Sequence, residues 1–92
     1  MGEDSRAQWR HDIDALAFEP DGHRSLCMVH HLAFRSLLRL DPAPDDCMAY
    51  FAAHEAAFRQ AAQAKILRKG IRSGTNFHLT SRDLSRTGSV SV

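Results

Sequence analysis

The sequence predicts a single α+β domain: a small antiparallel sheet packed against one long and one short helix, in the order ββααβ. Three features of the chain predict this fold. Residues 45–70 have the apolar spacing of a long amphipathic helix, residues 14–29 have the pattern of a β-hairpin, and residues 75–80 have that of a third strand. Laying the long helix across the sheet is the simplest way to bury these apolar residues.

The chain is long enough for one domain. It has 92 residues, of which 43% are hydrophobic and 25% are charged, and these fractions are ordinary for a globular protein. We assign residues 11–85 to the domain. Residues 1–10 are polar and are expected to be loosely ordered, with Trp9 the one residue able to anchor them, and residues 86–92 are expected to form a flexible tail.

The hairpin is predicted from two short extended runs, residues 14–19 and 23–29, on either side of a Pro-Asp-Gly turn at residues 20–22. In the second run, alternation places Leu26 and Met28 on one face and Cys27 and Val29 on the other. Both faces are therefore apolar, which is typical of a strand that is covered on both sides.

This two-sided strand also predicts self-association. One long helix covers one face of the sheet, and apolar surface exposed on the other face marks an interface. The short helix at residues 31–40 is the alternative cover, which would leave a monomer. Because that helix is short for a whole sheet face, we expect a symmetric homodimer, the commonest oligomer.

The short helix is predicted from apolar residues at helical spacing, namely Leu32, Phe34, Leu37, Leu38 and Leu40. The two prolines within residues 41–44 end it, because a proline disfavours helix in the residue before it.

The long helix has a start and a stop signal. Asp45 is its expected N-cap, Asp46 adds negative charge to the first turn, and Gly70 can adopt the left-handed conformation past its end. Its apolar side is formed by Phe51, His54, Phe58, Ala61, Ala62 and Lys65. We expect Phe51 and Phe58 to pack on the sheet. His54 lies between them, so it is expected to be a half-buried, pH-sensitive residue at the core edge.

The last predicted strand places Phe77 and Leu79 on one face, and residues 81–84 close the fold.

Charge is unevenly distributed along the chain. Residues 1–64 carry six arginines against ten carboxylates, a net charge of −4, whereas residues 65–92 carry six cations against Asp83 alone, a net charge of +5. The six cations are a candidate anion or nucleic-acid patch: Lys65, Arg68, Lys69, Arg72, Arg82 and Arg86. The alternative is a solvated helix end whose cations complement the helix dipole.

No pattern indicates a metal, cofactor or catalytic site. Cys27, His30 and His31 are close in sequence, but the chain has no Cys-x-x-Cys or His-Glu-x-x-His spacing. Cys47 lies in the first turn of a helix, where amide dipoles activate a thiol, but two aspartates precede it. We expect both cysteines to be free thiols in a reducing cytoplasm, since no leader or membrane-spanning segment is visible.

The chain resembles a family of small bacterial proteins catalogued as domain of unknown function 1488. The resemblance covers residues 14–84 and rests on Phe18, Gly22, the Cys-Met-Val strand at residues 27–29, a short helix, a helix with Phe51, His54, Ala62 and Lys65, and the closing residues 79–84. At His30 and His31 the chain departs from the family pattern. The resemblance implies a small α+β fold and no established activity, and some members carry the label of transcriptional regulator.

Three hypotheses about function follow. The first, which we favour, is a non-enzymatic cytoplasmic module that self-associates or binds a protein partner. The second is a nucleic-acid-binding accessory or transcription-related protein that uses the basic C-terminal third. The third, a small enzyme or metal protein built around His54, Cys27 and the pair His30 and His31, lacks a convergent set of catalytic groups.

Overall fold

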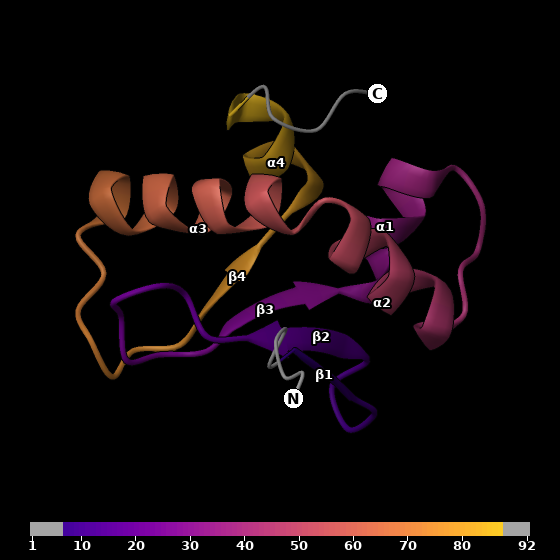
Figure 1. The fold of residues 1–92 in the computed structure, drawn as a ribbon, viewed down its shortest axis with the longest axis horizontal. Coiled ribbons are helices and arrows are strands. Elements are labelled where there is room, and N and C mark those ends of the chain that lie inside the picture. Colours follow the sequence, from indigo (N-terminus) through magenta and orange to yellow (C-terminus); the bar gives the residue numbers. More distant parts are fainter. Residues whose placement is uncertain (1–6, 88–92) are drawn as a thin grey trace.

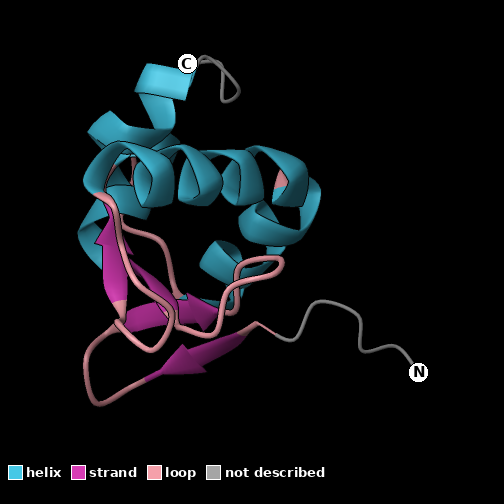
Figure 2. Ribbon diagram, turned by 90° about the vertical axis from the view of Figure 1, so that its left-hand side faces the viewer, coloured by secondary structure: helices cyan, strands magenta, loops and turns pink. Residues whose placement is uncertain are grey.

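The computed structural model describes residues 7–87, and their side chains up to residue 85. Its elements follow one another as β1 (Gln8–Arg10), β2 (Ala15–Phe18), β3 (Cys27–His30), α1 (His31–Leu38), α2 (Pro44–Ala53), α3 (Glu55–Lys69), β4 (Phe77–Leu79) and α4 (Ser81–Thr87). They form two layers, with the helices over one face of the sheet (Figures 1 and 2). The predicted α+β class is confirmed. The predicted order ββααβ did not include β1 or α4, and it treated α2 and α3 as one helix.

The sheet is mixed, with strand order β1-β2-β3-β4. β1, β2 and β3 form an antiparallel meander, and the predicted hairpin is confirmed by the pairing of Leu16 with Val29. β4 runs parallel to β3, with Leu79 opposite Val29, so the prediction of a wholly antiparallel sheet was wrong for this strand. The reason lies in the connection: three helices separate β3 from β4, and such a crossover allows the chain to enter the sheet in the same direction again.

The hairpin connection contains the predicted turn. The amide of His23 donates to the carbonyl of Pro20 at 3.3 Å, and Gly22 adopts φ 67°. A positive φ at this position suits glycine, because a Cβ there would be strained. The turn thus brings β3 back beside β2.

The ends of the domain differ from the prediction. Gln8–Arg10 was assigned to a loosely ordered segment, but it forms β1, where Trp9 pairs with Leu16. At the other end, α4 continues to Thr87, past the expected boundary at residue 85. Residues 1–6 and 88–92, the rest of the predicted loose segment and tail, lie outside the described residues.

The core lies between the sheet and the helices. Phe51 and Phe58 are 1% and 0% exposed, which confirms their predicted packing. Their ring centroids are 5.2 Å apart, and Phe51 lies 5.0 Å from Phe18 of the sheet. Phe34 of α1 joins the same cluster at 5.8 Å from Phe58. The short helix therefore belongs to the helical layer and does not cover the second face of the sheet.

The two faces of β3 are apolar as predicted. Cys27 and Val29 contribute to the core beneath the helices, whereas Met28 packs with Ala15 and Ala17 on the other face. These three residues are 0–8% exposed. The second face therefore does not expose the apolar surface on which the predicted homodimer was based.

The predicted long helix is two helices. α2 begins at Pro44, with Ala43 as its N-cap, so the assignment of Asp45 as N-cap was wrong. Asp46 accepts the amide of Ala43 at 2.9 Å from the third helical position, which is one half of a capping box. At the other end the prediction is confirmed: Gly70 is left-handed at φ 63° and its amide donates to Ile66.

Candidate functional site

An apolar groove lies where β3 and β4 end. On the side of β3 and α1 it is lined by His30, Leu32, Ala33 and Ser36, and on the side of β4 and α4 by His78, Leu79, Thr80 and Ser81. Its volume is about 500 Å³, within the usual range of about 300–1,000 Å³ for ligand pockets. None of its lining residues is acidic.

The parallel pairing of β3 and β4 creates this groove. The two strands end side by side, and each leads directly into a helix, α1 after His30 and α4 after Thr80. Each of these helix starts is held by a local cap. His30 Nδ1 accepts the amide of Leu32 at 3.1 Å and thereby begins α1. Clefts outside the carboxyl ends of parallel strands are where open α/β sheets bind their ligands.

Leu32 is the most informative residue of the groove. It is 56% exposed, whereas its neighbours Ala33 and Leu79 are buried at 8% and 1%. A leucine on the solvent side of a short helix contributes nothing to the core, yet here it extends an apolar wall. In the sequence, Leu32 served only as one of the apolar positions that predict the short helix, and the groove was not predicted.

The start of α4 is a capping box. The carboxylate of Asp83 accepts the amide of Thr80 at 2.9 Å, and the amide of Asp83 donates to the hydroxyl of Thr80 at 3.2 Å. Thr-x-x-Asp at residues 80–83 is the sequence signature of such a helix start. No helix was predicted at residues 81–87, although this signal is present in the sequence.

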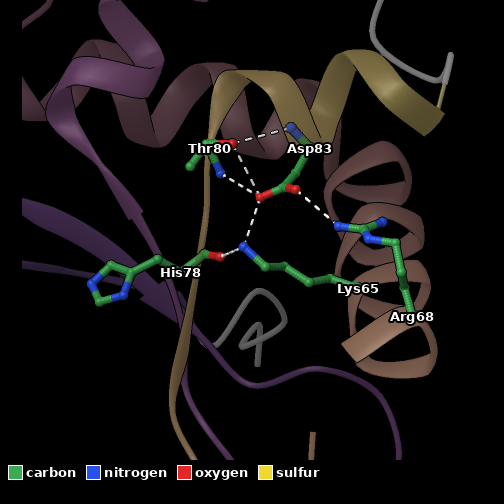
Figure 3. A network of polar contacts seen from close by, with 5 residues as sticks. All are labelled: Lys65, Arg68, His78, Thr80 and Asp83. Atoms are coloured by element: carbon green, nitrogen blue, oxygen red, sulfur yellow. Dashed lines mark hydrogen bonds and ion pairs between the residues drawn. The ribbon is translucent and has the colours of Figure 1, made fainter. Parts of the chain in front are cut away.

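Asp83 also holds two of the six cations predicted to form an anion patch (Figure 3). Lys65 Nζ donates to Asp83 Oδ2 at 2.8 Å, and Arg68 donates to Asp83 Oδ1 at 3.1 Å. Burial raises the pKa of Asp83, but the hydrogen bonds from Lys65 and Thr80 outweigh it, so its pKa lies below the ordinary value. Lys65 and Arg68 are therefore structural partners of this carboxylate.

The same network covers the outer edge of β4. The amide of Phe77 donates to Leu26, and by alternation the carbonyl of His78 faces away from β3. Lys65 Nζ donates to that carbonyl at 2.6 Å, and the outward amide of Thr80 is held by Asp83. Side chains thus satisfy backbone groups that would otherwise invite another strand to pair.

The remaining cations of the predicted patch lie apart from this network. Lys69, Arg72 and Arg82 are exposed, and the side chain of Arg86 lies outside the described residues. The structure adds a cation that sequence reasoning did not include. Arg24 is joined to the loop after Arg72, because its amide donates to the hydroxyl of Ser73 at 3.4 Å and its carbonyl accepts the amide of Gly74.

His54 is not where the helical spacing placed it. It is exposed and forms the junction between α2 and α3, with φ −124° and ψ 29°. Its ring lies on that of Tyr50, with centroids 4.4 Å apart. The prediction of a half-buried, pH-sensitive residue at the core edge assumed one continuous helix, and the break at His54 itself turns its side chain away from the core.

Both cysteines are buried and free. Burial raises the pKa of the Cys27 thiol. For Cys47, burial and then the charges of Asp46 and Asp14 raise the pKa to about 11. Both thiols therefore remain protonated near neutral pH, and neither has the activated thiolate of a nucleophile.

Two further histidines, His23 and His31, contact neighbouring polar groups. His23 bridges the hydroxyl of Ser25 at 2.6 Å and the carbonyl of Ile71 at 3.1 Å, and His31 lies 3.0 Å from Asp41. Within the described residues, no three or more metal-ligating side chains converge.

A second cavity, of about 670 Å³, lies at the hairpin turn. Although it is larger, its main cation is engaged. Arg59 donates to Glu55, to Asp21 and to the carbonyl of Glu19, at 2.8–3.1 Å. We interpret this cavity as a surface hollow around a structural clamp that fixes the turn on α3.

Comparison with family models, curated proteins and solved structures found no match. The family resemblance described above stays a prediction. Among residues 7–87, the structure contains no helix with the length and hydropathy to cross a bilayer.

Proposed function

We propose that this protein is a non-enzymatic interaction module that binds a protein segment in the groove between α1 and the junction of β4 with α4. The observation that carries the proposal is the groove itself, an apolar cavity of about 500 Å³ with the exposed Leu32 in its wall. Isolated exposed leucines are ordinary, but one that continues into a concave apolar surface is typical of a binding site.

The residues around the groove support the binding of a protein segment more than the catalysis of a reaction. Its polar lining consists of His30, His78 and three hydroxyl groups. Exposed Arg35 and Arg82 follow in the same helices, α1 and α4. A segment with an apolar anchor and flanking carboxylates complements this arrangement. We place the protein in the bacterial cytoplasm, since free cysteines are typical of reducing compartments.

A peptide titration tests the proposal. The probes are two amphipathic peptides of equal length, one built from Leu, Ala and Glu and the other from Leu, Ala and Lys. In 15N–1H correlation spectra, we expect the Glu peptide to shift residues of α1 and β4 and to bind Leu32→Glu at least about tenfold more weakly. Leu67→Glu, at an exposed position of α3, is the matched control. Equal shifts with both peptides, or none, would contradict the proposal.

The second candidate function is nucleic-acid binding. It is favoured by the exposed Lys69 and Arg72 and by the hydrogen bonds that join Arg24 to the same loop. Three phosphate contacts predict a slope of about −3 for log K against log salt concentration on duplex DNA. Binding that is absent at low salt, or unchanged in Lys69→Glu with Arg72→Glu, would eliminate this candidate.

A further inference from the structure

We propose that the segment bound in the groove is the Leu40 loop of a second copy of this chain. This inference rests on the proposed function and names its partner. In the proposed two-fold symmetric dimer, Leu40 of each protomer lies in the groove of the other. The interface then contains the same two surfaces twice, which closes the assembly at two subunits.

Leu40 is suited to be such an anchor. It is 54% exposed and follows Arg39, which ends α1 in the left-handed conformation at φ 60°. This turn stops the helix, and Pro42 shortly after it prevents helix from resuming at once. Leu40 is therefore held at the surface of a constrained turn, so ordering it on binding costs little entropy.

The spacing along α1 makes the arrangement self-complementary. Leu32 lies in the first turn of α1 and Leu40 lies two residues past its last residue, Leu38, with exposed Ser36 midway between them in the sequence. In the proposed dimer, two copies of α1 lie antiparallel across a two-fold axis near Ser36, which brings the Leu40 turn of one protomer toward Leu32 of the other. The small side chain of Ser36 lets the two helices approach closely at the axis.

Charge favours the same pairing. The groove is lined by no acidic residue, and exposed Arg82 lies beside it on α4. The segment after Leu40 carries three exposed carboxylates, which outnumber Arg39: Asp41, which lies 3.0 Å from His31, Asp45, and Asp46, which accepts the amide of Ala43. An acidic loop against a groove with cations around it is electrostatically complementary, and this sets the register of the two copies.

Leu67 shows by contrast why the Leu40 loop is the better occupant. It is the most exposed large apolar residue described, at 81%. However, exposed Lys69 follows two residues later, and this cation would meet the cations around the groove. Leu67 therefore serves as a control position of greater exposure that lies outside the proposed interface.

Sedimentation equilibrium of the purified full chain tests the inference. We expect a reversible monomer–dimer equilibrium with a Kd between about 1 and 100 μM, the range of small interfaces. Leu32→Glu and Leu40→Glu, which alter opposite halves of the contact, should each raise that Kd at least about tenfold. Leu67→Glu should leave it unchanged, and far-UV circular dichroism verifies that all three variants are folded.

The outcomes separate this inference from the proposed function. A wild-type protein that is monomeric at about 500 μM overturns the dimer, and a groove that still binds the Glu peptide then leaves the proposed function intact. A dimer that Leu67→Glu dissociates, while Leu32→Glu and Leu40→Glu do not, also overturns it. The inference is supported if Leu32→Glu and Leu40→Glu both dissociate the dimer and Leu67→Glu does not.

Discussion

Replacing Asp83 with asparagine tests how the C-terminal part of the fold is held. Asp83 joins α4 to α3 through Lys65 and Arg68, and its carboxylate also accepts the amide of Thr80. Asparagine has nearly the same shape and retains one carbonyl oxygen for that amide. The substitution therefore removes the negative charge and leaves the packing in place.

The size of the effect follows from burial. The side chain of Asp83 is 10% exposed, and those of Lys65 and Arg68 are 17% and 33% exposed. Removing one partner of a fully buried ion pair costs about 3–5 kcal/mol, whereas an exposed pair contributes about 0–1 kcal/mol. For this partly buried network we expect Asp83→Asn to lower the free energy of unfolding by about 2 kcal/mol.

The effect depends on pH with a definite sign. Because the pKa of Asp83 is lowered in the folded state, its stabilisation is fully present above the unfolded-state pKa of about 4. It is lost as the pH falls through the lower, folded-state pKa. The difference between the wild type and Asp83→Asn should therefore be greatest at pH 7 and disappear in strong acid.

Urea unfolding followed by circular dichroism at 222 nm measures these differences. Asp12→Asn is the matched control, because Asp12 also forms two hydrogen bonds with an arginine, but its side chain is 60% exposed. We expect its unfolding midpoint to equal that of the wild type. If Asp83→Asn lowers the free energy of unfolding by less than about 0.5 kcal/mol at pH 7, the reasoning is refuted, because removing a buried anion from between two cations should destabilise the fold by more than that.

Three further predictions concern the core, the helix junction and the thiols. Phe58→Ala should cost about 3–5 kcal/mol in urea unfolding, because Phe58 is fully buried among Phe34 and Phe51; a loss below about 1 kcal/mol would show that this face is not the core. His54→Ala should change stability by less than about 0.5 kcal/mol, since His54 is exposed, and a loss above about 2 kcal/mol would argue against the exposed junction. Cys27 and Cys47 should both resist a thiol reagent in the native protein and both react in urea, because each is buried and protonated; fast native labelling of either would contradict this.

Local signals in the sequence predicted the hairpin and the core correctly. The Pro-Asp-Gly turn determines where β2 and β3 meet, and the spacing of Phe51 and Phe58 determines which helix face is buried. The break at His54 was not predictable by the same means, because apolar spacing continues unchanged across it. Local signals could not predict the direction of β4 either, because its parallel pairing with β3 depends on the path of the three preceding helices.

The candidate site was less predictable than the fold. Its walls come from two strand-to-helix junctions that are about 50 residues apart in the sequence and become neighbours only through the parallel pairing of β3 and β4. For the basic patch, by contrast, closeness in the sequence was misleading. The sequence places six cations near one another, but it does not indicate that Asp83, the one carboxylate among them, is buried against Lys65 and Arg68.

Site-specific photocrosslinking inside cells tests the central claim, that the groove binds a protein segment, most directly. The crosslinker p-benzoylphenylalanine replaces His78, an exposed aromatic side chain that lines the groove, or Leu67, which is exposed on α3. We expect a discrete adduct, whose mass gives the partner, from position 78 and none from position 67. No adduct from position 78, or the same adducts from both positions, would contradict the claim.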